Sequence, residues 1–200
     1  MKVVVIGASG TLGRAVCAEL KQRHEVIEVG ATRGDYHVDA TNLPSVERLF
    51  HDIGRVDAVV ATIGKVHFGP FHEMTADQFW VGLRDKLMGQ INVVLAAQSH
   101  VNDGGSFTLT GGILADEPIR EGINATTVNF ALEGFVRGAA IELPRGLRIN
   151  LVSPTILEES VQAYGAYFRG FEPVSAQRAA LAFSRSVEGA QTGRIYRVGS

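Results

Sequence analysis

The sequence is poor in cysteine, in excess positive charge and in long apolar runs, and each shortage excludes a class of protein. Cys17 is the single cysteine, which excludes an internal disulfide framework and a metal cluster held by cysteines alone. Lys and Arg number 19 against 21 Asp and Glu, and the basic residues are scattered, which argues against a nucleic-acid partner. No apolar run approaches the ~20 residues that cross a bilayer. The apolar run after Lys2 ends at Ile6, shorter than a signal-peptide core, so we expect a cytoplasmic protein without a nucleic-acid or membrane partner.

Short apolar runs alternate with longer amphipathic ones along the chain, which is typical of repeated β-α units. Runs that are almost continuous in Val and Ile indicate strands buried on both faces of a parallel sheet. The length suits one domain over residues 1–200. We therefore predict an α/β fold of the Rossmann type, a doubly wound parallel sheet flanked by helices in three α/β/α layers. The predicted strands are residues 2–6, 25–29, 56–61, 105–110, 147–152 and 194–198.

Apolar residues at helical spacing predict helices between these strands. Gly54 and Pro144 are expected to end two of them, and Thr75 and Gln78 have the spacing of a capping box. The predicted helices span residues 43–54, 75–98, about 126–143, about 158–168 and about 175–187.

The first predicted strand runs into the sequence GASGTLG, in which Gly7, Gly10 and Gly13 precede a further helix. A strand that turns tightly into a helix, with a pyrophosphate against its backbone, favours glycine at each of these points. The helix N-terminus then binds the anion through its free N–H groups. The sequence contains neither the GK[ST] of a P-loop nor a G-x-S-x-G nucleophile elbow. We predict a dinucleotide site; the alternative is a glycine-lined turn that binds nothing.

The end of the second strand indicates which dinucleotide the site takes. An acid there would bind the ribose hydroxyls of NAD, and a cation would bind the 2'-phosphate of NADP. The chain has Gly30 at the expected acid position, followed by Thr32 and Arg33, and a guanidinium matches phosphate oxygens. We therefore predict NADP rather than NAD. Glu28 and Asp35 keep NAD as the alternative, and Arg33 would then be an exposed loop cation.

Five segments occur in an order typical of one enzyme family: GASGTLG (7–13), VDAT (38–41), TIG (62–64), ALEGFVRGAAIEL (131–143) and LRINLVSP (147–154). In this order the chain resembles a short-chain dehydrogenase/reductase over nearly its whole length. The resemblance implies an oxidoreductase that forms a homodimer or homotetramer, in which helices 75–99 and 126–143 pair across interfaces. By position it also implies the cofactor contacts Gly7, Ser9, Gly10, Thr11, Leu12, Gly13, Thr32, Arg33, Asp39, Ala40, Ala61, Thr62, Ile63, Pro154 and Ile156.

The four residues that carry this family's usual chemistry are absent. The family uses a Tyr as general acid, a Lys four residues later, a Ser that holds the substrate carbonyl and an Asn on the preceding long helix. Aligned on ALEGF, these positions hold Ala125, Asn129, Gly112 and Lys86 respectively. No tyrosine in the sequence has a lysine four residues after it, so a shifted register does not restore the pair. The sequence therefore resembles an atypical subgroup that lacks the active-site residues.

Three other side chains are candidates for moving a proton. Burial would lower the pKa of Lys86, Thr110 lies on the same strand face as Gly112, and His67 follows the strand end nearest a nicotinamide. The structural alternatives are a solvated or interface lysine, a buried strand hydroxyl and a loop histidine. His67 and His72 have no third ligand nearby in the sequence, so no metal site is predicted.

Two functions therefore stay open, and the substrate is not identified. The chain is an NADP-dependent oxidoreductase with a non-standard active site, or a non-catalytic NADP(H)-binding or sensing module that acts through a partner. A quinone or an activated double bond would suit an enzyme without the usual acid, because hydride donation needs mainly orientation and an acceptor. In the family, the region equivalent to residues 155–177 covers the substrate. Here Tyr164, Tyr167, Phe168 and Phe171 would roof an apolar pocket or pack in the core.

Overall fold

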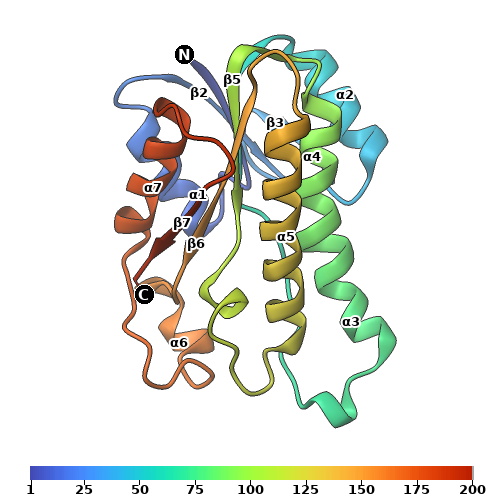
Figure 1. The fold of residues 1–200 in the computed structure, drawn as a ribbon, viewed down its shortest axis with the longest axis vertical. Helices are drawn as coiled ribbons and strands as arrows, with labels where there is room; N and C mark the ends of the chain where they lie inside the picture. Colours follow the sequence, from blue (N-terminus) through green and yellow to red (C-terminus); the bar gives the residue numbers. More distant parts are fainter. Residues whose placement is uncertain (200) are drawn as a thin grey trace.

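The computed structural model describes residues 1–199, whose seven strands form one sheet between two layers of helices (Figure 1). Every strand pairs in parallel with its neighbours, in the order β3-β2-β1-β4-β5-β6-β7. The predicted doubly wound parallel sheet is confirmed. The strands are β1 (Lys2–Ile6), β2 (Glu25–Gly30), β3 (Tyr36–His37), β4 (Val56–Ala61), β5 (Val101–Thr110), β6 (Arg148–Pro154) and β7 (Ile195–Val198).

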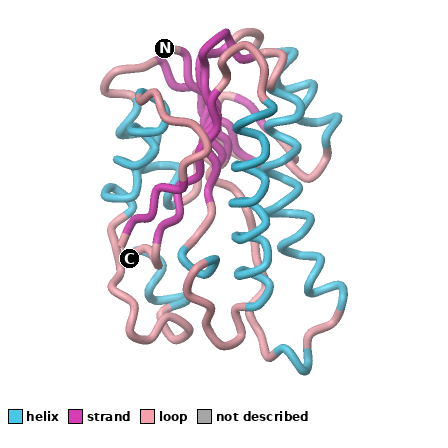
Figure 2. The backbone as a smooth tube through the Cα atoms, in the orientation of Figure 1, coloured by secondary structure: helices cyan, strands magenta, loops and turns pink. Residues whose placement is uncertain are grey.

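The helices divide between the two faces of the sheet, as the tube in Figure 2 also shows. One face is covered by α1 and α7, and the other by α2, α4 and α5 (Figure 1). The helices are α1 (Thr11–Leu20), α2 (Leu43–Ile53), α3 (Ala76–Gly82), α4 (Gly89–Ala97), α5 (Ile123–Glu142), α6 (Val161–Tyr164) and α7 (Ala176–Glu188). Short 3-10 turns are η1 (Phe71–Glu73), η3 (Ile113–Ala115) and η4 (Glu158–Ser160), and η2 (Leu83–Met88) is π-helical.

Alternate side chains of each central strand enter different cores, which explains the almost continuous apolar runs. In β1, Val4 and Ile6 pack toward α2, α4 and α5, whereas Val3 and Val5 pack toward α1 and α7. All four side chains are almost fully buried. A third, smaller cluster around Leu114 lies beyond the carboxyl ends of the strands.

Several element boundaries differ from the predictions. The two-residue strand β3 is too short to give a periodic pattern, and β5 begins at Val101, before a bulge that shifts its pairing with β4. Helix α5 begins at Ile123 rather than at the predicted Thr126. Its N-cap is Gly122, which has no capping side chain, so the sequence does not mark this helix start. The predicted helix at 158–168 ends at Tyr164 and consists of η4 and α6.

The helix expected at residues 75–98 is continuous from α3 through η2 to α4 but widens to a π-helix in its middle. Its start is as predicted, since Thr75 and Gln78 form a reciprocal capping box. Apolar periodicity continues through a π-turn, so the sequence pattern did not reveal it.

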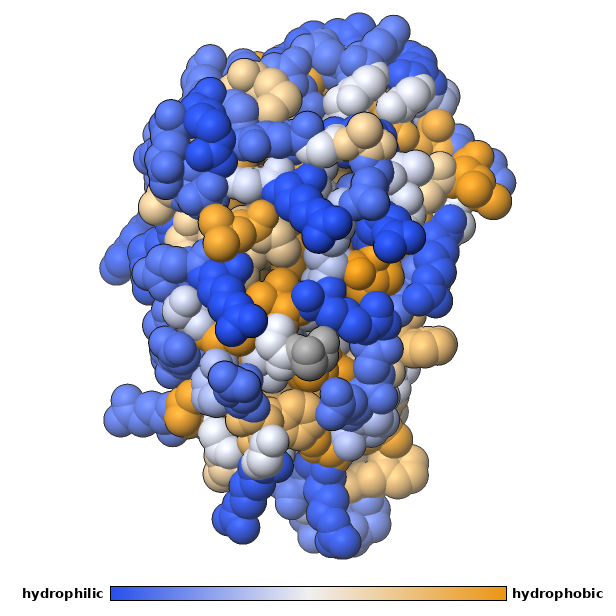
Figure 3. Space-filling model, turned by 60° about the vertical axis from the view of Figure 1, so that its left-hand side comes forward, coloured by the Kyte–Doolittle hydropathy of each residue, from blue (hydrophilic) through white to orange (hydrophobic). Residues whose placement is uncertain are grey.

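The surface mixes polar and apolar residues. Figure 3 shows a face that is largely hydrophilic at its top and edges, with apolar residues gathered in its middle. Among the helices of residues 1–199, none is both long and apolar enough to cross a membrane.

Candidate functional site

The sheet order places a crevice where β1 and β4 meet. The chain leaves β1 toward β2 on one side and later returns through β4 on the other side, so the loops after these two strands diverge. In open α/β sheets, ligands bind outside the carboxyl ends of the strands at such a switch point. Here α3, α6 and the loops between them gather at this end of the sheet (Figure 1).

The glycine loop after β1 is tightly folded at this crevice. Gly7 has a φ of 89°, and its N–H donates to the Val29 carbonyl at 2.8 Å. A Cβ on Gly13 would collide with the Gly7 carbonyl group, so the close approach of α1 requires glycine. Gly10 is the N-cap of α1 and has no side chain to bind the first amides of the helix. The N–H groups of Thr11 and its neighbours are therefore free to bind an anion.

At the end of β2, Arg33 is exposed, and the two nearby acids, Glu28 and Asp35, already have partners within the protein. A Cβ on buried Gly30 would collide with the Arg33 carbonyl oxygen, so an acid at position 30 does not fit this loop. The side chain of Glu28 pairs with Lys21. The Asp35 carboxylate accepts the backbone N–H of Glu28 at 2.9 Å. Arg33 is exposed beside the loop, as is Thr32. This arrangement suits a phosphate better than ribose hydroxyls.

A cavity of about 400 Å³, here called the glycine-loop cavity, brings several predicted cofactor residues together. Gly7, Asp39, Ala40 and Ile63 all line it. Asp39 accepts hydrogen bonds from the N–H and hydroxyl of Thr41 through Oδ1. The walls therefore offer a carboxylate and apolar surfaces, which suits a purine ring with its ribose.

Two residues at the end of β4 that are predicted to contact the cofactor, Ala61 and Thr62, form hydrogen bonds within the protein instead. The Thr62 hydroxyl donates to the Ile6 carbonyl at 3.1 Å, and the Ala61 carbonyl accepts from the Thr110 hydroxyl at 2.7 Å. Thr62 also packs close to Gly7, where an added Cβ would lie 2.8 Å from it. These residues shape the crevice through their backbone and packing.

A second cavity, of about 160 Å³, is called the lysine cavity. The four positions aligned with the family's catalytic residues, Lys86, Gly112, Ala125 and Asn129, all line it. Residues of the β6 end complete its wall, namely Pro154, Thr155 and Ile156. The residues that line this cavity come from η2, the end of β5, α5 and the end of β6. The four positions aligned with the family's catalytic residues are therefore far apart in the sequence but meet at one place in the structure.

Lys86 is directed into this cavity from the π-helical turns. Its Nζ donates to the Gly111 carbonyl at 2.9 Å, and burial lowers its pKa to about 8. The aliphatic part of the Lys86 side chain packs directly against Gly64, where a Cβ would collide with the methylenes of Lys86. Gly64 also has a φ of 133°, so glycine is required there for two reasons. Lys86 is therefore a partly buried ammonium and not a solvated surface lysine.

Two buried polar atoms beside Lys86 have no hydrogen-bond partner within the described part of the chain. They are Asn129 Oδ1 and Thr155 Oγ1, on residues that are 3% and 4% exposed. A Cβ on Gly112 would lie 2.9 Å from Asn129 Nδ2, so the asparagine partly fills the place of a side chain at 112. Unpartnered buried polar atoms are costly, and ligand groups would satisfy these two.

The other two candidates for proton transfer fit their structural alternatives. The Thr110 hydroxyl is already a donor to Ala61, and Gln90 binds the Thr110 backbone N–H and carbonyl. The backbone N–H of His67 donates to Asn124 Oδ1, while its neighbours Val66 and Phe68 are the residues that line the lysine cavity. Within residues 1–199, no group of three or more His, Cys, Asp or Glu side chains could hold a metal ion.

A third cavity, of about 550 Å³, is called the outer cavity and adjoins the other two. It shares Gly64 and Lys65 with the glycine-loop cavity. With the lysine cavity it shares Val66, Phe68, Ile156 and Phe168.

Aromatic rings form the roof of the outer cavity. The ring centroid of Phe68 lies 4.9 Å from that of Tyr167 and 5.7 Å from that of Tyr164, and Phe168 and Phe171 extend the cluster. Tyr164 and Phe168 line the cavity, as the roof hypothesis expects, whereas Tyr167 and Phe171 do not. Phe168 and Phe171 also pack against the cluster around Leu114, as the core alternative expects. Phe68 was missed from the sequence, because GKVHFGP reads as an ordinary loop.

Comparison with known proteins identifies the family. Residues 1–194 match the family model described as enoyl-(acyl carrier protein) reductase. The chain belongs to the short-chain dehydrogenase/reductase family. Among solved structures, the protein lin1944 from Listeria innocua is 48% identical, with a TM-score of 0.97 over 99% of both chains. A small-chain dehydrogenase in complex with NADPH is 21% identical, with a TM-score of 0.90 over 99% of this chain and 96% of that chain, and shares the fold.

Relatives of assigned activity are more distant and longer. Hydroxynaphthalene reductase arp2 of Aspergillus fumigatus is 28% identical over 143 residues, which cover 67% of this chain and 52% of the relative. Hydroxynaphthalene reductase-like protein Arp2 of Metarhizium brunneum is 24% identical over 176 residues, which cover 76% and 66%. The chain therefore spans about half to two thirds of the length of these short-chain dehydrogenases/reductases.

Proposed function

We propose that the chain is an NADP(H)-dependent oxidoreductase with a non-standard active site in the lysine cavity. The observation that carries the proposal is that the three cavities adjoin one another through shared wall residues. Along the carboxyl edge of the sheet, exposed Arg33 after β2, the glycine loop after β1 and the lysine cavity at the ends of β5 and β6 follow in this order. Lys65 and Phe68 lie in the walls that adjoining cavities share. A dinucleotide is an extended molecule with its phosphates in the middle, so such a chain of sites suits it.

Each part of the cofactor would have its own place along this edge of the sheet. The first turn of α1 would hold the pyrophosphate, Asp39 and Ile63 would border the adenosine, and Arg33 would bind the 2'-phosphate. Pro154 and Ile156 border the lysine cavity, where the nicotinamide would lie. The unpartnered Asn129 and Thr155 oxygens support a polar ligand at that place.

The cofactor supplies the chemistry that the chain lacks. When bound, a nicotinamide donates or accepts a hydride, which needs orientation more than a protein nucleophile. The protein would exclude water through the apolar roof and would position the acceptor beside Lys86. The NADPH complex of one structural relative and the reductase names of the fungal relatives support this assignment.

The second candidate is a non-catalytic NADP(H)-binding or sensing module. Gly112 and Ala125 favour it, because the positions of the family's Ser and Tyr carry no group that could move a proton. Under this alternative the glycine loop and Arg33 still bind the nucleotide, but the lysine cavity performs no turnover.

A fluorescence titration with NADPH and, in parallel, NADH tests the cofactor assignment. We expect micromolar NADPH binding, weaker NADH binding, and a loss of about 10- to 100-fold in NADPH affinity for Arg33→Ala, because a charge-assisted contact is removed. Arg48→Ala, an exposed arginine on α2, is the matched control and should bind NADPH normally. Preference for NADH, or equal affinities of Arg33→Ala and the parent protein, would contradict the assignment.

We further propose that the protein is a homodimer or homotetramer. Phe130 and Ile141 on α5 are 60% and 85% exposed and lie three turns apart on one side of the helix. Leu95 on the neighbouring α4 is 47% exposed. Exposed apolar side chains gathered on two adjacent helices are typical of an interface.

A further inference from the structure

We propose that the Lys86 ammonium binds and protonates the oxyanion that forms on a flat, conjugated carbonyl substrate, such as an enone or a quinone. The lysine thereby replaces the family's tyrosine as the proton donor. This inference rests on the proposed function and adds to it a catalytic residue and a substrate class.

The position of Lys86 is the first support. Its Nζ lies 2.9 Å from the Gly111 carbonyl, at the end of β5 and within the cavity that also holds Ala125. A single hydrogen bond to a neutral carbonyl leaves other N–H groups of the ammonium free to bind a ligand. Gly112 has no side chain and Ala125 has only a methyl group, so neither position places a bulky or acidic group in the lysine cavity.

The electrostatic surroundings are the second support. Among the described residues that line the lysine cavity, Lys86 is the only one with an ionisable side chain. The adjoining outer cavity adds Lys65 and Tyr164, and the neighbouring Asp85 accepts the Lys65 backbone N–H. The ammonium thus has no carboxylate partner in its own cavity, and burial lowers its pKa to about 8. A group that is charged at neutral pH and can release its proton suits both tasks.

The shape and lining of the outer cavity indicate the substrate class. Phe68, Tyr164 and Phe168 present aromatic surface, and Ile156 and Leu157 present aliphatic surface. Such walls favour a flat, uncharged body through stacking and burial of apolar area. The carbonyl oxygen of the substrate would then meet the Lys86 ammonium.

The proposed reaction is a two-electron reduction of the substrate by the reduced cofactor. When bound, the reduced cofactor supplies the hydride, and therefore both electrons, and leaves as its oxidised form. The hydride adds to a substrate carbon, and the electron pair of the conjugated system moves onto the carbonyl oxygen. An N–H bond of Lys86 breaks while an O–H bond forms on that oxygen. The neutral amine then regains a proton from water, so one substrate and one proton are consumed with each NADPH.

The test is binding of 4-nitrophenol to the protein saturated with NADP⁺, because the absorbance of the probe distinguishes phenol from phenolate. We expect the parent protein to bind the phenolate at least about tenfold more tightly than the phenol, which lowers the apparent pKa of the bound probe by about one unit. Lys86→Met should abolish this preference and Lys86→Arg should keep it, because arginine retains the charge. Lys2→Met, which removes a lysine at the amino end of β1, opposite the carboxyl edge of the sheet, is the matched control.

The outcomes separate this inference from the proposed function. If the parent protein does not bind NADP⁺, the proposed function fails, and the inference fails with it. If NADP⁺ binds but the phenolate has no advantage, or if Lys86→Met keeps that advantage, the inference alone is wrong. A loss of more than tenfold in NADP⁺ affinity for a folded Lys86→Met protein would also overturn it, because the amine would then anchor the cofactor.

Discussion

At the scale of the residue, the glycine loop is the most constrained feature of the site. A Cβ on Gly13 would enter the space of the Gly7 carbonyl, which is backbone and cannot move aside. We expect Gly13→Ala to lower NADPH affinity at least about tenfold and to destabilise the fold by about 1–3 kcal/mol. Titration and thermal unfolding measure the two effects.

The control for this change is a distant glycine that is constrained by its backbone conformation alone. Gly104 has a φ of 74° and free space around it, at the opposite end of β5. Gly104→Ala should cost about 1 kcal/mol through backbone strain alone. If Gly104→Ala impaired NADPH binding as much as Gly13→Ala does, the loss of affinity would reflect lower stability and not a change in the glycine loop.

The sequence predicts the tight glycine loop well because its constraints are local. Gly7, Gly10 and Gly13 are fixed by one turn, and their spacing is visible in the chain. Lys86 could be named as a candidate, but its burial could not be predicted. That burial depends on the π-turn and on Gly64, which lies 22 positions earlier in the sequence.

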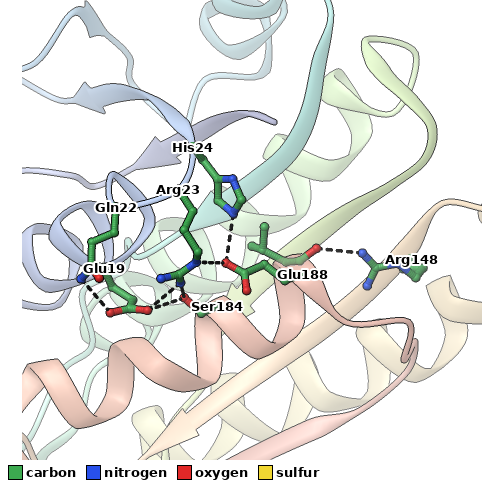
Figure 4. A network of polar contacts seen from close by, with 8 residues as sticks. Glu19, Gln22, Arg23, His24, Arg148, Ser184 and Glu188 are labelled. Carbon is green, nitrogen blue, oxygen red and sulfur yellow. Dashed lines mark hydrogen bonds and ion pairs between the residues drawn. The ribbon is translucent and has the colours of Figure 1, made fainter.

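At the scale of the element, a polar network joins the end of α1 to α7 (Figure 4). Arg23 pairs with Glu188 at 2.9 Å and with Glu19 at 2.7 Å, and His24 Nε2 lies 3.0 Å from Glu188. Burial tends to raise the pKa of Glu188, but hydrogen bonds from Arg23 and His24 outweigh it, so the pKa is lowered. The pKa of Glu19 is lowered mainly by its hydrogen bond to Arg23.

This network predicts an acid-sensitive contribution to stability. A carboxyl whose pKa is lower in the folded state stabilises the fold above its unfolded pKa, and the effect is lost as the pH falls through the folded value. We expect Glu188→Gln to lower the melting temperature by about 2–4 °C at pH 7. The difference from the parent protein should shrink below about pH 4. Glu47→Gln, on the exposed side of α2, should change little at either pH.

The same scale shows where sequence patterns fail. Strands β1, β2 and β4 were predicted within a residue, because apolar runs between turns are unambiguous. Strand β3 has two residues and escapes any periodic analysis. The π-helical η2 keeps apolar spacing and differs from an α-helix only in its hydrogen bonding, which the sequence does not record.

At the scale of the whole molecule, the exposed apolar side of α4 and α5 predicts self-association. We expect Phe130→Glu combined with Ile141→Glu to convert the protein to a monomer, because burying two carboxylates in an apolar contact is unfavourable. Light scattering after gel filtration measures the mass. Leu181→Glu, at a leucine on α7 across the sheet that is 58% exposed, is the control and should leave the oligomer of the parent protein intact. A parent protein that is already monomeric would contradict the prediction.

The central claim is that the glycine-loop, outer and lysine cavities form one site for NADP(H) and its substrate. A crystal structure of the protein with NADPH tests this most directly. We predict the adenosine phosphate beside Arg33, the pyrophosphate on the first turn of α1, and the nicotinamide in the lysine cavity near Pro154 and Lys86. A nicotinamide outside that cavity, or a nucleotide elsewhere on the sheet, would contradict the account.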